Sequence, residues 1–124
     1  KHPGKGLWAL PGGYLNPAEQ IVDGCIRELK EETHIAVPRQ ILRDLAAGSH
    51  DNVHVFGHPD RSLRGRIVTH AHLINLGATG DLPQVKGGDD ADLAVWMPIS
   101  DVYLHEDKFF EDHAEIIKFF LGRL

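Results

Sequence analysis

The sequence has very little cysteine, no long apolar run and no excess of positive charge. Cys25 is the only cysteine among 124 residues, so the chain can form neither an internal disulfide nor a zinc site built of cysteines. A reducing compartment fits this composition, and we expect a cytoplasmic protein. No apolar run approaches the roughly 20 residues of a membrane helix, and no signal-peptide pattern opens the chain, so we expect no membrane partner. Because the chain begins at Lys1 rather than at a methionine, we expect a fragment of a longer protein.

The charge balance is acidic, with 13 Lys and Arg against 18 Asp and Glu and a formal net charge of −5. Such a chain offers no broad basic surface, so we expect no nucleic acid partner for this domain. If its ligand is itself anionic, a bound divalent cation would offset the local repulsion. With 42% hydrophobic residues, a chain of this length can bury a core of its own, and we expect a single domain over residues 1–124.

Apolar periodicity and turn residues predict an α/β fold. The clearest helix covers residues 17–33, where Asn16 is a suitable N-cap, Pro17 takes the first helical position and Glu19 completes a capping box. A second helix is predicted over residues 109–121. Helices and strands that alternate in this way favour an α/β sandwich. The strands are predicted at residues 7–10, 41–47, 53–56, 66–76 and 93–97, and long loops at 57–65 and 77–91.

Three glutamates gather on the first predicted helix. Glu28 and Glu32 are one turn apart on the same face, and Glu31 lies beside them. Like charges at this spacing cost a helix a few tenths of a kcal/mol each, so the cluster favours a bound cation. Carboxylate oxygens suit Mg²⁺, for which Mn²⁺ may be exchanged. The alternative is an ordinary solvated acidic face, neutralised by Arg27 and Lys30.

The spacing around these glutamates resembles the Nudix box, written G-x5-E-x7-R-E-U-x-E-E-x-G-U with U aliphatic. One fixed position differs, because His34 stands where the box has glycine. That residue ends the helix in a left-handed conformation, which histidine adopts at a cost of about 1 kcal/mol. The resemblance implies the Nudix fold, an α/β/α sandwich with a mixed β-sheet and the catalytic helix at about 17–33. The matching positions are Gly13, Glu19, Arg27, Glu28, Leu29, Glu31, Glu32 and Ile35.

The same resemblance implies a role for each matching residue. Glu28 and Glu32 would be the main ligands of Mg²⁺, and Glu31 either a third ligand or the residue that orients the attacking water. Arg27 would hold the glutamates in place through salt bridges. The Gly12-Gly13 turn would bring the backbone to the metal, where the carbonyl of Gly12 would be a ligand. Glu19 remains open between a capping role and the same positioning role as Arg27.

Segments outside the box look like the ADP-ribose pyrophosphatase branch of the Nudix family. They look most like the Nudix domain that is fused to nicotinamide-mononucleotide adenylyltransferase in bacterial bifunctional proteins. The resemblance implies Mg²⁺-dependent hydrolysis of ADP-ribose, a small nucleotide substrate, to AMP and ribose 5-phosphate. The segments in question are residues 7–13, 59–66, 85–91 and 109–113.

Two of these segments supply further candidate site residues. Arg61, Arg64 and Arg66 are candidate substrate-binding residues because guanidinium groups bind phosphates in a bidentate manner. They could equally be solvated or paired with a nearby acid such as Asp60. Asp90, at the end of a Gly-Gly-Asp-Asp sequence, is a candidate general base, although acidic turns are also common without any such role.

Two other functions remain open from the sequence. One is a transcriptional regulator of NAD metabolism whose Nudix domain senses ADP-ribose without cleaving it, and the other is a Nudix pyrophosphatase for another nucleotide. Regulators of that kind often have degraded boxes and a winged-helix segment. Here all the carboxylates of the box are present and no such segment is found. The resemblance further implies a possible homodimer and fusion to another domain in the full-length protein.

Overall fold

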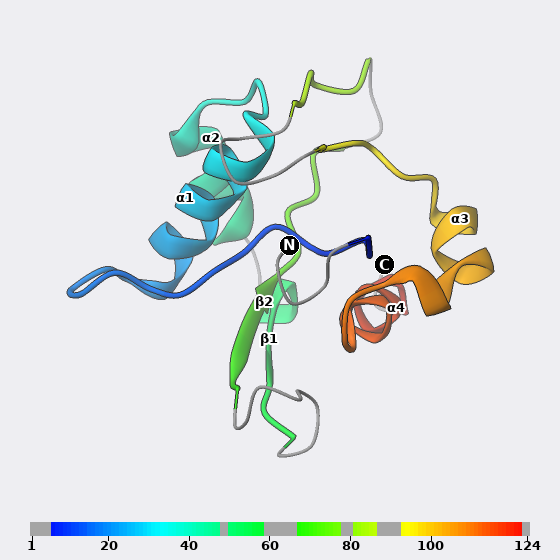
Figure 1. Ribbon diagram of the computed structural model, residues 1–124. Coiled ribbons are helices and arrows are strands. Elements are labelled where there is room, and N and C mark those ends of the chain that lie inside the picture. Colours follow the sequence, from blue (N-terminus) through cyan, green and yellow to red (C-terminus); the bar gives the residue numbers. More distant parts are fainter. Residues whose placement is uncertain (1–5, 48–49, 59–66, 78–80, 87–92, 123–124) are drawn as a thin grey trace. The chain divides into compact units, whose positions relative to one another are not determined.

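The computed structural model describes residues 6–47, 50–58, 67–77, 81–86 and 93–122 (Figure 1). The chain divides into two compact units. We call Pro11–Val53 with His72–Trp96 the glutamate unit, and Lys1–Leu10 with His54–Ala71 and Met97–Leu124 the aromatic unit. In the described ranges, no helix is both long enough and apolar enough to cross a membrane.

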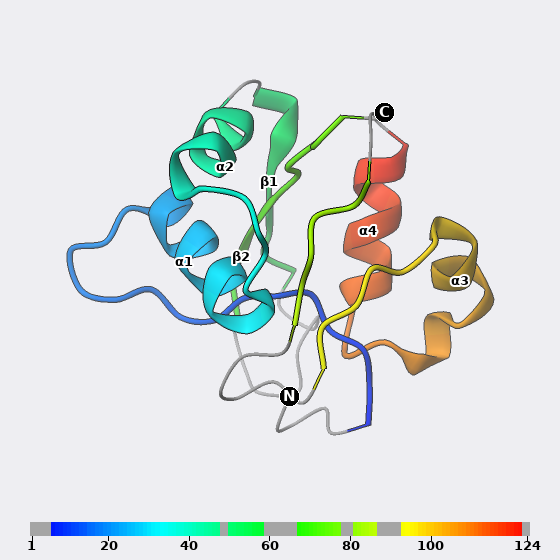
Figure 2. The same cartoon turned by 90° about the horizontal axis from the view of Figure 1, so that it is seen from above.

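The glutamate unit is built around two helices that pack against each other, α1 (Ile21–Thr33) and α2 (Arg39–Ala46) (Figures 1 and 2). A short 3-10 helix, η1 (His50–Asn52), follows α2. Ile26 of α1, Ile35 of the connecting turn and Leu42 of α2 form the buried core of this unit. Burial of such side chains is the main stabilising contribution and fixes which face of α1 points inward. The partly buried residues around this core are Val22, Leu29, Val37, Ile74, Leu76 and Val85.

Helix α1 begins at Ile21, four residues later than the sequence predicted. Ala18 has a φ of 65°, a left-handed conformation that cannot continue into a right-handed helix. Residues 16–19 form a turn instead, in which the amide of Glu19 donates to the carbonyl of Asn16 at 3.2 Å. The amide of Asn16 donates in return to Oε1 of Glu19 at 3.0 Å. The prediction of a first helical turn was therefore wrong, although the side chain of Glu19 does bond back to Asn16.

The C-terminal end of α1 is held by two sets of hydrogen bonds. His34 has φ 48° and ψ 35°, so the predicted left-handed end of the helix is confirmed, and its amide donates to the carbonyl of Lys30 at 2.9 Å. The ammonium group of Lys30 donates to the carbonyls of Ile35 at 3.0 Å and Val37 at 2.9 Å. A lysine in the last turn of a helix is well placed to satisfy carbonyls that have no helical partner.

The predicted strand at residues 41–47 is wrong, because this segment belongs to α2. Leu42 and Ala46 are buried one helical turn apart, which matches helical rather than strand periodicity. Gln, Leu, Arg and Ala, which fill most of α2, are also good helix formers. Pro38 immediately precedes the first helical residue and stops the helix from extending backwards.

A two-stranded sheet joins β1 (Val53–Phe56) to β2 (Thr69–His72). The amide of Leu73, just after β2, donates to the carbonyl of Asn52, just before β1, at 2.7 Å. The two strands therefore run antiparallel. The predicted strand at 53–56 is confirmed, whereas the strand predicted at 66–76 is confined to β2 within its described residues.

Two other predicted strands are reduced or missing. Residues 7–10 contribute only an isolated parallel bridge between Trp8 and Phe109. Its hydrogen bonds run from the amide of Trp8 to the carbonyl of Lys108 and from the amide of Phe110 to the carbonyl of Trp8, each at 2.8 Å. Residues 93–97, all within the described part of the chain, form no strand. An apolar run becomes a strand only if a neighbouring edge is free to pair with it.

The aromatic unit contains α3 (Ile99–Leu104), the 3-10 helix η2 (Glu106–Lys108) and α4 (His113–Leu121). Helix α3 was not predicted, and α4 starts four residues later than residue 109. Phe109 has an extended backbone, and Glu111 has a φ of 46°, so neither can be helical. His54 and Phe56 of β1 pack against Phe119 of α4, with ring centroids 4.2 Å and 5.4 Å from it. The buried residues of the aromatic unit include Val102, Phe109 and Ala114.

Candidate active site

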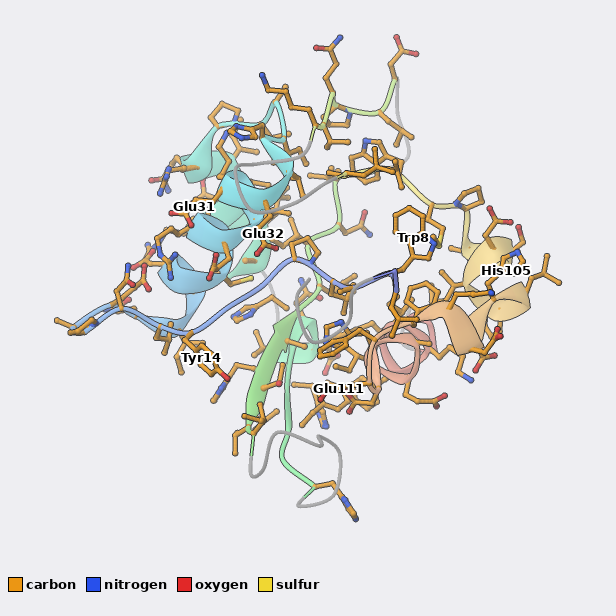
Figure 3. The ribbon with its side chains drawn as sticks, in the orientation of Figure 1. Trp8, Tyr14, Glu31, Glu32, His105 and Glu111 are labelled. Atoms are coloured by element: carbon orange, nitrogen blue, oxygen red, sulfur yellow. The ribbon has the colours of Figure 1, made fainter. Side chains whose placement is uncertain are left out.

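Helix α1 presents three glutamates at different depths. Figure 3 shows Glu31 and Glu32 projecting from α1 as neighbouring side chains. The side chain of Glu28 is 15% exposed and that of Glu31 is 56% exposed. Glu32 is half-buried. The two carboxylates one turn apart, Glu28 and Glu32, are therefore the ones withdrawn from solvent, and Glu31 stands at the rim.

The Gly12-Gly13 turn lies directly against these two partly buried carboxylates. The amide of Gly12 donates to Oε1 of Glu32 at 3.0 Å. Gly13 approaches Glu28 so closely that a Cβ at this position would meet its carboxylate. The resemblance implied that this turn would bring the backbone close to the metal cluster, and within the glutamate unit the turn contacts Glu28 and Glu32.

Arg27 connects the glutamates to the segment that precedes α1. Its guanidinium donates to both carboxylate oxygens of Glu19, from Nε at 2.8 Å and from Nη2 at 3.1 Å. Nη2 also donates to the carbonyl of Tyr14 at 3.1 Å. Nη1 lies 3.2 Å from Oε1 of Glu31 and 3.6 Å from Oε1 of Glu28. The salt bridges expected of Arg27 are present, and Glu19 both bonds to Asn16 and pairs with Arg27.

The carboxylates fall into two electrostatic classes. Burial, followed by repulsion from Glu31, raises the pKa of Glu28, although Arg27 works against the shift. Burial also raises the pKa of Glu32, and the charge of Glu28 adds to it, while the amide of Gly12 opposes it. By contrast, the hydrogen bond from Arg27 lowers the pKa of Glu19. Glu19 is therefore satisfied by protein partners, whereas the negative charges of Glu28 and Glu32 are only partly compensated.

The donor set suits a hard divalent cation. In the part of the chain that the structure describes, no three His, Cys, Asp or Glu side chains are already gathered around one metal position. Mg²⁺ does not require such a cage, because it is commonly held by one or two carboxylates together with water and substrate phosphates. Glu28 and Glu32 supply two such carboxylates. Burial is the main cause that raises both pKa values, and a cation beside them would stabilise the charged forms that burial and mutual repulsion disfavour. The residues present therefore fit Mg²⁺.

Four candidate site residues lie outside the described residues, namely Arg61, Arg64, Arg66 and Asp90. The chain on the N-terminal side of Asp90 is described up to Lys86. The amide of Lys86 donates to the carbonyl of Thr33, the last residue of α1, at 2.7 Å. The amide of Ala36 donates to the carbonyl of Gln84 at 3.0 Å. The segment that leads to Asp90 is thus attached to the end of the helix that bears the glutamates.

The sequence analysis missed two features of this site. Lys30 was considered only as a partner for neighbouring glutamates, whereas its ammonium group binds two backbone carbonyls beyond α1. Its position in the last turn of the helix was the available signal. The resemblance placed the Gly12-Gly13 turn near the metal cluster, but it did not indicate that the carboxylate of Glu28 fills the space where a side chain of residue 13 would lie, since contacts between residues 15 positions apart leave no trace in local patterning.

A family model described as the NUDIX domain matches residues 1–120. The chain is 32% identical over 117 residues to an ADP-ribose pyrophosphatase of Methanocaldococcus jannaschii, which covers 94% of this chain and 59% of the relative.

Two solved structures from Francisella tularensis are similar over almost the entire chain. One is a bifunctional NMN adenylyltransferase/ADP ribose pyrophosphatase, with 39% identity and a TM-score of 0.89 over 98% of this chain. The other, described as complexed with AMP and Mn ion, has 39% identity and a TM-score of 0.90 over 99% of this chain. This chain spans 35% of each of those proteins. It has the Nudix fold, and it belongs to the NUDIX domain family.

Proposed function

We propose that this domain hydrolyses ADP-ribose to AMP and ribose 5-phosphate in a Mg²⁺-dependent reaction. The observation that supports it most is the pair of withdrawn carboxylates on α1, Glu28 and Glu32, which lie one turn apart against the Gly12-Gly13 turn. The substrate is proposed from similarity to an ADP-ribose pyrophosphatase over 94% of the chain. One structural relative is complexed with AMP and Mn ion, which fit a product and a substitute metal of that reaction.

In the proposed reaction, the oxygen of water bonds to one phosphorus of the diphosphate and the bond to the bridging oxygen breaks. The bridging oxygen leaves on one product and the water oxygen is retained on the other, so AMP and ribose 5-phosphate account for all atoms. Glu28 and Glu32 would hold Mg²⁺, and the chemistry that the ion would supply there is neutralisation of the diphosphate charge and a lower pKa of the attacking water. Glu31, at the exposed rim, completes the metal site or orients that water. The carbonyl of Gly12 is the proposed backbone ligand.

Arg27 is proposed as a positioning residue. Its guanidinium donates four hydrogen bonds to protein groups, two to Glu19, one to Glu31 and one to the carbonyl of Tyr14. A guanidinium in that arrangement has little capacity left for a substrate phosphate. It keeps the glutamates in register with the turn before α1 through its bond to the carbonyl of Tyr14.

Asp90 is proposed as the general base that accepts a proton from the attacking water. The length of chain between Lys86 and Asp90 is compatible with this role. Lys86 is bonded through its amide to Thr33, the residue after Glu32. Asp90 is four positions after Lys86, and at most about 3.5 Å of chain per position gives a reach of about 14 Å from this anchor.

The substrate and the protein context complete the proposal. Arg61, Arg64 and Arg66 are proposed to bind the phosphates, because a guanidinium pairs with two phosphate oxygens at once. We further propose a single Nudix domain over residues 1–124, a cytoplasmic location, a homodimer, and fusion to a second domain as in the bifunctional relatives.

A panel of nucleotides tests this proposal. ADP-ribose, 8-oxo-dGTP and other nucleoside diphosphate derivatives should be incubated with the protein, with Mg²⁺ and with EDTA, and the products separated chromatographically. We expect AMP and ribose 5-phosphate from ADP-ribose, and a kcat/KM at least about tenfold above that for 8-oxo-dGTP, which needs only about 1.4 kcal/mol of discrimination. A preference for triphosphates would overturn the substrate and leave the fold intact. Tight binding of ADP-ribose without products would instead indicate a sensor.

A further inference from the structure

Gly13 of the turn lies close against the carboxylate of Glu28 on α1. A Cβ placed on Gly13 would lie 2.7 Å from Cδ of Glu28 and 3.4 Å from its Oε1, with Oε2 nearer still. Non-bonded carbon atoms prefer a separation of about 3.5–4.0 Å. Any side chain at position 13 would therefore occupy the space in which the carboxylate of Glu28 now lies.

Glycine is required here by space and not by backbone conformation. The glycines with positive φ in the described residues are Gly6 and Gly77. Gly13 is not among them, so an L-amino acid could adopt its backbone without strain. At the neighbouring Gly12, nothing lies within 4 Å of an added Cβ. The two glycines of the turn therefore differ sharply in what a methyl group would meet.

The carboxylate of Glu28 has little room to retreat. Nη1 of Arg27 lies 3.6 Å from its Oε1. Arg27 is itself fixed by two hydrogen bonds to Glu19 and one to the carbonyl of Tyr14. The side chain of Glu28 is only 15% exposed. A methyl group on Gly13 would push the carboxylate away from the turn, and the confinement by Arg27 limits where it can go.

From these contacts we propose that Gly13 is a positioning residue for the metal ligand Glu28. The bare Cα of Gly13 leaves a space that sets where the carboxylate lies, and Nη1 of Arg27, 3.6 Å from Oε1 of Glu28, limits where the carboxylate can move. This inference rests on the proposed function, because it assumes that Glu28 binds the metal. The displaced atoms are the end of a flexible side chain, so Gly13→Ala should fold normally and yet misplace a ligand. A misplacement of about 1 Å in an active site can lower a rate by about a hundredfold.

The test is a double-mutant cycle on metal affinity, measured by electron paramagnetic resonance of Mn²⁺ with the free protein and without substrate. The variants are Gly13→Ala, Glu28→Gln and the two combined, with Gly122→Ala as a matched control. An added Cβ at Gly122 makes only ordinary contacts, at 3.6 Å and 3.8 Å. Gly12→Ala alters the same turn without a clash, so its effect should be smaller than that of Gly13→Ala. Thermal unfolding of each metal-free variant shows whether the fold is retained.

We expect Gly13→Ala to weaken Mn²⁺ binding at least about tenfold in the parent and by less than about twofold in the Glu28→Gln background. Equal losses in both backgrounds would overturn the inference, because Gly13 would then act without Glu28. Parent-like affinity in Gly13→Ala, with a clear loss in Glu28→Gln, would overturn it as well and leave the proposed function standing. If Glu28→Gln itself binds Mn²⁺ as the parent does, Glu28 is not a metal ligand. That outcome would contradict the proposed function, and with it the inference that rests on it.

Discussion

Replacing Glu32 by glutamine should make the metal-free protein more stable at neutral pH while it removes activity. Glu32 is half-buried and faces the charge of Glu28 one turn away, and both effects raise its pKa. Like charges at this spacing cost about 0.2–0.5 kcal/mol on an exposed helix, and partial burial increases that figure. Glutamine keeps an oxygen that can accept the hydrogen bond from Gly12, although a neutral acceptor binds less strongly. The expected net gain is about 0.5 kcal/mol, or about 2 °C in the midpoint of thermal unfolding.

The pH dependence of this gain has a definite sign. The pKa of Glu32 is higher in the folded state than its ordinary value of 4.5, so the folded state holds this proton more tightly. Stability of the parent is therefore lost as pH rises from that ordinary value through the raised pKa. The advantage of Glu32→Gln should be absent at about pH 3.5, where both states are protonated, and complete at about pH 7.5.

Thermal unfolding followed by circular dichroism in EDTA, at both pH values, provides the measurement. Glu31→Gln is the matched control, because Glu31 is 56% exposed and paired with Arg27 at 3.2 Å, so its removal should not stabilise the protein. Added Mg²⁺ should then stabilise the parent more than Glu32→Gln, since only ligands that bind the folded state raise the midpoint. A midpoint for Glu32→Gln below that of the parent at neutral pH in EDTA would refute the argument that this carboxylate lacks a compensating charge.

Two further predictions concern the support of the helix and the residues beyond it. Lys30→Met removes the two hydrogen bonds to the carbonyls of Ile35 and Val37, so it should lower the free energy of unfolding by about 2 kcal/mol, measured by urea titration. Lys30→Arg should retain most of the stability of the parent. An unchanged unfolding midpoint in Lys30→Met would contradict the role of Lys30 in holding the end of α1. Asp90→Asn should lower kcat with little effect on the Mg²⁺ requirement, and Arg64→Ala should raise KM, as steady-state kinetics on ADP-ribose would show. Parent-like kcat in Asp90→Asn would mean that the base lies elsewhere.

The positions of the candidate site on its helix were easier to predict from the sequence than the bounds of the helices and strands. Glu28 and Glu32 lie on one face of a helix because helical geometry places residues four apart together, whatever surrounds them. The left-handed end at His34 followed from the position where the helix must stop. Such features depend on residues that are close in the sequence, so the sequence alone can predict them.

The errors arose where tertiary contacts decide the structure. The segment predicted as a strand at 41–47 lies in α2, where Leu42 and Ala46 are buried one helical turn apart. An apolar run of that length does not by itself distinguish a strand from a helix. Phe109 is extended because it pairs with Trp8, about a hundred residues earlier in the chain. The bond from Gly12 to Glu32 and the space that Gly13 leaves for Glu28 likewise depend on the path of the turn before α1.

The most direct test of the central claim is the rate at which Glu28→Gln releases AMP from ADP-ribose at saturating Mg²⁺. If Glu28 holds the metal, the substitution removes one anionic ligand while the fold is retained, and the rate should fall at least about a hundredfold, close to 3 kcal/mol of lost transition-state stabilisation. Circular dichroism of the same sample would show that the helix is intact. A folded Glu28→Gln variant that releases AMP at close to the parent rate would contradict the assignment of the α1 carboxylates to metal-dependent hydrolysis.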